Sequence, residues 1–99
     1  MTALTVLAPA DKGDPAWAEA GSIAEIEELV RAGRTVVVTP ADLAGQDGEA
    51  AELAAASVCA WAGARVFRTS RPDQVQLAVE MTESLAGRRP PTLTRRGLA

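Results

Sequence analysis

The chain has 99 residues, of which 47% are hydrophobic and 23% charged, a composition typical of one soluble globular domain and too short for two cores. It contains no His, no Tyr and one Cys, which excludes Ser-His-Asp and Cys-His catalysis, intrachain disulfides and zinc clusters. No apolar run approaches the ~20 residues of a membrane span, and no signal peptide is recognisable. We therefore expect a cytoplasmic protein away from membranes, with no catalytic residue, metal or cofactor.

Charge is divided unevenly along the chain. The net charge is −3, but all 13 acidic residues precede residue 88, whereas the segment 88–99, RRPPTLTRRGLA, contains four arginines and no acid. This segment has a Pro-Pro step and no apolar periodicity, which predicts a flexible basic tail after a single α/β domain over 1–87. Because no aromatic residue interleaves these arginines and the body is acidic, we expect no specific nucleic-acid binding.

Three short runs of β-forming residues predict strands over 4–7, 35–39 and 65–69. Val36, Val37 and Val38 are β-branched residues in a row, which is typical of a parallel strand covered on both faces. The connection after the first strand, residues 8–21, is longer than the others. Within it, Asp14-Pro15 predicts a turn of helix that presents Trp17.

Three helices alternate with these strands, over 22–32, over 49–62, and from Ser70 to the residue before Gly87. Their ends are marked by capping residues and by glycines, which are the usual start and stop signals of helices. The order βαβαβα forms three βα units. It predicts an α/β protein with a small parallel sheet, either partial TIM-barrel-like or short Rossmann-like.

Two features of this topology predict uncovered apolar surface. Right-handed crossovers that all step in one direction place every helix on one sheet face, so the other face is expected to be bare. The helix over 49–62 is apolar around nearly its whole circumference, as in helices that are buried on more than one side. We expect a homo-oligomer, most simply a dimer, whose interface includes Leu53, Val58 and Trp61. The alternative is an ordinary, well-covered core helix.

The end of the third strand contains the only cluster that suggests a ligand, since α/β proteins bind small molecules at the carboxyl ends of their strands. Its candidate anion-binding residues are Arg68, Thr69, Ser70 and Arg71. If Ser70 caps the next helix, backbone N–H groups, a hydroxyl and two guanidinium groups converge there on a phosphate-type anion. In the alternative interpretation Ser70 only caps, and Arg68 pairs with a carboxylate such as Asp42 or Asp11.

An Ala-rich helix, a Gly-Ala step, a strand and a closing amphipathic helix follow one another in the segment 52–85, ELAAASVCAWAGARVFRTSRPDQVQLAVEMTESL. This segment resembles the C-terminal end of dihydropteroate synthase, the folate-pathway barrel enzyme, and the preceding TVVVTPADL fits the upstream unit loosely. The resemblance implies that Arg68 stands where the family's Arg-x-His arginine holds the phosphate or diphosphate of the pterin substrate. Ser70 replaces the histidine of that motif, and the family's pterin-contacting lysine has no counterpart.

Three βα units are far fewer than the eight of a complete barrel. The sequence therefore favours a small non-catalytic protein, similar to dihydropteroate synthase, that acts through self-association or protein contacts. Two alternatives stay open. The chain is either a module that binds a pterin- or phosphate-type anion at 68–71, or a subunit that completes a folate-pathway enzyme, a dihydropteroate-synthase-like transferase, with a separate partner.

Overall fold

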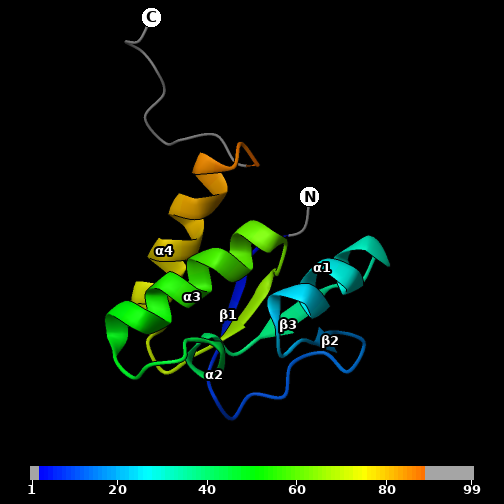
Figure 1. Cartoon of the computed structure of the whole chain (residues 1–99). Helices are drawn as coiled ribbons and strands as arrows, with labels where there is room; N and C mark the ends of the chain where they lie inside the picture. The colour runs from blue at the N-terminus through cyan, green and yellow to red at the C-terminus, as the bar shows by residue number, and fades with distance from the viewer. Residues whose placement is uncertain (1–2, 89–99) are drawn as a thin grey trace, which may run out of the picture.

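A computed structural model describes residues 3–88 of the chain, so the predicted tail beyond Arg88 lies outside the described residues. The elements within this range are β1 (Thr5–Leu7), β2 (Ala18–Glu19), α1 (Ile23–Arg31), β3 (Val36–Val38), α2 (Pro40–Leu43), α3 (Glu49–Ala62), β4 (Val66–Arg68) and α4 (Pro72–Leu85). They form a parallel sheet beneath a layer of helices (Figure 1). The predicted α/β class with a small parallel sheet is thus confirmed.

The strands lie in the order β1-β4-β3-β2, and every pair is parallel. From β2 to β3 to β4 the chain steps in one direction without reversal, as successive strands do in a barrel. β1 lies at the opposite edge from β2, next to β4. β2 is not predicted from the sequence, because its two residues, Ala18 and Glu19, have neither the β-branched nor the aromatic side chains that indicate a strand.

The main core lies between the sheet and helices α1, α3 and α4. Val38 and Phe67 are paired across β3 and β4 and are both fully buried under the helices. The other buried residues of this core are Ala20, Ile26, Val36, Ala56, Cys59, Ala60, Ala64, Val75 and Val79. Alternate strand residues reach this face, so Val36–Val38 is buried on both sides, as its unbroken apolar run predicts.

The second face of the sheet is covered by the chain's own connection between β1 and β2. Leu7, Val37 and Val66 form a small buried cluster there, and Trp17 packs against it. Gly13 lies so close to this tryptophan that a Cβ atom would come within 2.9 Å of the ring. The expectation of a bare face is therefore wrong. Since β1 and β2 lie at opposite edges, the chain must cross the sheet between them, and this crossing covers the face.

Asp14-Pro15 forms a turn in this connection rather than a helix, with the N–H of Ala16 donating to Oδ1 of Asp14 at 2.8 Å. No helix among residues 3–88 combines the length and the apolar character that crossing a bilayer requires.

The helix ends follow local signals, with one exception. Ser22 caps α1 by accepting the N–H of Glu25 at 3.2 Å, and Gly63 ends α3 with a φ of 116°. Ser70 was expected to open α4, and this is wrong. The helix begins at Pro72, the N-cap position is Arg71, and the Arg71 N–H donates to the hydroxyl of Thr69. Proline at the first helical position determines this start because its φ is already helical.

A buried ion-pair network joins the end of α3 to α4. Nη1 and Nη2 of Arg65 each donate a hydrogen bond to one carboxylate oxygen of Glu83 at 2.7 Å, and Nη2 of Arg88 donates to the same carboxylate at 2.9 Å. Arg88 also donates to the carbonyls of Ala60 at 2.7 Å and Trp61 at 3.3 Å, in the last turn of α3. The first residue of the predicted tail, Arg88, is therefore bound to the folded body.

This network predicts an acid-labile component of stability. Burial alone raises the pKa of Glu83, but the hydrogen bonds and positive charges of Arg65 and Arg88 outweigh it and lower the pKa from 4.5 to about 2. The contribution to the free energy of unfolding, about 3 kcal/mol, is fully present above pH 4.5 and is lost as the pH falls toward 2, because the unfolded state then binds the proton more readily.

Urea unfolding at about pH 5.5 and about pH 2 measures this contribution. When the pH is lowered from about 5.5 to about 2, the free energy of unfolding of the wild type should fall by about 3 kcal/mol more than that of Glu83→Gln. Equal losses in the two proteins would contradict the assignment.

Candidate functional site

The carboxyl ends of β1, β3 and β4 surround a pocket of about 340 Å³. It is lined by Pro9, Thr39, Ala41, Asp42, Glu52, Arg68, Thr69 and Ser70. Three of the four predicted anion-binding residues therefore line one cavity, at the end of the sheet where ligands of α/β proteins bind. The fourth, Arg71, is not part of the lining.

Arg68 is held by an acidic partner on the second face of the sheet. Its Nη1 lies 2.9 and 3.0 Å from the carboxylate oxygens of Glu19, and its Nε donates to the backbone carbonyl of Asp11 at 3.2 Å. The guanidinium group is largely buried, with 14% of the side chain exposed. Arg68 thus pairs with a carboxylate, as the alternative interpretation of this corner expected. The partner is Glu19 rather than Asp42 or the carboxylate of Asp11.

Glu52 joins the other polar residues of the corner. Its side chain is 8% exposed, and it accepts hydrogen bonds from the Thr69 hydroxyl at 2.5 Å and from Nε of Arg71 at 3.1 Å. Nη1 of Arg71 also lies 3.5 Å from Glu49, while Ser70 is exposed. Glu52 is not among the residues predicted from the sequence, although it is one of few polar residues in an apolar helix and shares the face of Ala56, Cys59 and Ala60.

The charges at this corner are therefore largely compensated. Arg68 and Arg71 face the carboxylates of Glu19, Glu49 and Glu52, and the pocket lining adds Asp42. An incoming anion would have to compete with carboxylates already hydrogen-bonded to both guanidinium groups. These ion pairs hold α3 and α4 in place around the strand ends, and they leave little net positive charge for a ligand.

The predicted interface residues of α3 lie on two sides of the helix. Val58 and Trp61 are 52% and 59% exposed, and we call this pair the α3 surface. Leu53 is half-buried and packs against the main core. Since it precedes Val58 by five residues, it lies about 140° around the helix from it. The structure therefore brings Val58 and Trp61 together and places Leu53 apart from them.

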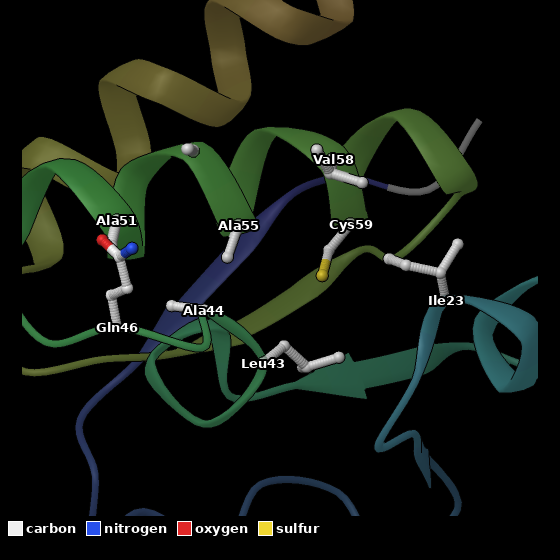
Figure 2. A pocket seen from close by; sticks show the side chains of 9 residues that line it. Ile23, Leu43, Ala44, Gln46, Ala51, Ala55, Val58 and Cys59 are labelled. Atoms are coloured by element: carbon white, nitrogen blue, oxygen red, sulfur yellow. The ribbon is translucent and has the colours of Figure 1, made fainter.

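An apolar groove of about 380 Å³ runs beside the α3 surface, between α1, α2 and α3 (Figure 2). It is lined by Ile23, Leu43, Ala44, Gln46, Ala51, Ala54, Ala55, Val58 and Cys59. Figure 2 shows the sulfur of Cys59 directed toward the groove between α3 and α2. Burial raises the pKa of this thiol to about 11, so it stays protonated and is a poor nucleophile. The groove offers apolar contact and little chemistry.

Within residues 3–88, no group of three or more His, Cys, Asp or Glu side chains is placed to hold a metal ion. The fold and the site together define a parallel α/β protein whose strand-end pocket contains compensated charges and whose helical layer exposes large apolar side chains. Comparison with known proteins finds no family model that matches the chain, no similar curated protein and no similar solved structure. The likeness to dihydropteroate synthase therefore stays a prediction from the sequence.

Proposed function

We propose that the chain is a small non-catalytic protein that acts by self-association. Val58 and Trp61 are exposed on α3. The observation that carries this proposal is the row of large apolar side chains exposed on α4, Leu77, Met81 and Leu85, at 61%, 58% and 79%. Contiguous apolar surface of this kind marks interaction sites in soluble proteins.

The polar groups support a non-catalytic role. Four of the polar side chains at the strand-end corner are already bonded within the fold: Glu52 accepts from Thr69 and Arg71, and Arg68 pairs with Glu19. The only cysteine in the chain is buried and protonated. A general base or nucleophile needs an accessible group with a suitable pKa next to a substrate position, and these residues lack that freedom.

Light scattering at micromolar concentrations tests the proposal. We expect a mass about twice the 10.3 kDa of one chain, because two copies are the commonest closed assembly. The mass should fall toward that of one chain on dilution. A mass of one chain at every concentration, up to the limit of solubility, would overturn self-association as the function.

A second function has one observation in its favour, the pocket lined by Arg68, Thr69 and Ser70. We infer from it an alternative role as a module that binds a phosphate- or pterin-type anion. Heat released on titration with inorganic phosphate by the wild type, and absent with Arg68→Ala, would favour this role over the first. The stepwise order of β2, β3 and β4, as in a barrel, is the observation that keeps a subunit of a folate-pathway enzyme as a third proposal.

A further inference from the structure

The edge strand β1 has one side of its backbone free for pairing. The N–H of Thr5 donates to the carbonyl of Arg65, and the carbonyl of Leu7 accepts the N–H of Thr69, both at 2.9 Å. Because successive residues of a strand direct these groups to opposite sides, those of Leu4, Val6 and Ala8 point away from β4. Among the described strands none lies on that side. Thr5–Leu7 also contains no charge, proline or bulge, the features with which proteins block edge pairing.

Helix α4 packs over β1 and exposes a row of apolar side chains, Leu77, Met81 and Leu85, which we call the α4 ridge. These residues are spaced four apart and are 61%, 58% and 79% exposed. Glu83 lies on the side of α4 that faces α3, because it pairs there with Arg65 and Arg88. Met81 lies about 160° around the helix from it. The ridge therefore lies on the side of α4 that faces away from α3. α4 itself lies at one side of the helical layer (Figure 1).

We propose that two copies of this chain associate by pairing their β1 strands, with the two α4 ridges packed against each other. A two-fold axis perpendicular to the sheet makes the two edge strands antiparallel and keeps both helical layers on the same side. One operation then satisfies the outward backbone groups of Leu4 and Val6 and covers the ridge; the carbonyl of Ala8 already accepts the N–H of Asp11 at 3.0 Å. This inference rests on the proposed self-association and names its surface.

The charge distribution favours a second copy as the occupant. Residues 3–88 contain 13 acidic and seven basic residues, a net charge of −6, yet neither β1 nor the α4 ridge includes any of them. Two acidic bodies can therefore meet at this edge without like charges in direct opposition. A strongly basic partner would find no carboxylate among the residues of β1 or of the α4 ridge to pair with.

The size of the contact determines its expected strength. The edge strand and the ridge provide fewer residues than the 20–30 per partner of a standard interface. We therefore expect a reversible dimer with a dissociation constant on the order of micromolar, which dilution separates. This range is suited to light scattering and to amide exchange.

Matched charge substitutions on α4 and α3 test the surface. Met81→Glu should remove the dimer, whereas Trp61→Glu on the α3 surface should leave it unchanged; both side chains are more than half exposed, so neither substitution disturbs the core. Leu85→Glu, at 79% exposure, is a second ridge variant whose folding is even less at risk. A dimer that survives both ridge variants, or that Trp61→Glu abolishes, would overturn the proposal and leave self-association itself standing.

Residue-resolved amide exchange gives a readout that needs no variant. The Thr5 amide is bonded to Arg65 within one chain and should be protected at every concentration. The Val6 amide points outward and should become protected only at concentrations where the dimer forms. Exchange at Val6 that does not change between monomer and dimer would overturn the strand pairing. A wild-type chain that never dimerises would overturn the proposed function together with this inference.

Discussion

Replacing Glu83 by alanine is expected to lower the free energy of unfolding by about 3–5 kcal/mol. The Glu83 carboxylate is 2% exposed and holds two guanidinium groups, of which that of Arg65 is 10% exposed. Removing the carboxylate leaves the Arg65 charge buried with only the carbonyls of Gly63 and Ala60 as acceptors. An uncompensated buried charge costs far more than the loss of a surface ion pair. Chemical denaturation at neutral pH measures the change.

A substitution of the same type at an exposed helical site provides the control. Glu27 is exposed on α1, and Glu27→Ala should change the unfolding free energy by less than about 0.5 kcal/mol. The two variants remove the same side chain from a helix and differ in burial and partners. Similar midpoints for Glu83→Ala and Glu27→Ala would show that the buried network contributes little to the stability of the fold.

Phe67→Ala is expected to destabilise the fold by a comparable amount, about 3–5 kcal/mol. Phe67 is fully buried at the centre of β4, where it meets the helical layer. Its removal costs the transfer free energy of the ring and leaves a cavity beneath α3 and α4 that these helices can fill only in part. Leu77→Ala on the α4 ridge should change the unfolding free energy much less, since Leu77 is 61% exposed. The urea midpoint, with unchanged slope, reports the difference. A small effect of Phe67→Ala would mean that the strand can repack.

Local signals account for the elements that the sequence predicts well. The capping box at Ser22, the glycine at position 63 and the β-branched run at Val36–Val38 each act within a few residues of the structure they determine. The start of α4 is the informative failure. Ser70 is a favourable capping residue by type, but Pro72 and the bond between Thr69 and the Arg71 N–H place the N-cap one residue later, at Arg71.

The position of the candidate site could be predicted from the sequence, but the pairing of its charges could not. The end of β4 is a ligand-binding position in any parallel sheet, and the pocket does lie there. Whether its arginines are free depends on Glu19 and Glu52, which are 49 and 19 residues away from Arg68 and Arg71, the arginines they bind. Nothing in the local pattern around Arg68 or Thr69 indicates these partners, so the compensation of charge at the corner emerges only from the folded chain.

The alternation of strands and helices, the α/β class and the apolar character of α3 can be predicted from residue order alone, because periodicity, capping and side-chain type act over one or two turns of chain. The strand order, the cover that Trp17 provides for the second face, and the position of β1 at an open edge beside the α4 ridge follow only from the folded chain. These features are contacts between segments far apart in the chain. Their balance of burial, hydrogen bonding and loop closure depends on the whole fold and on no single stretch of residues.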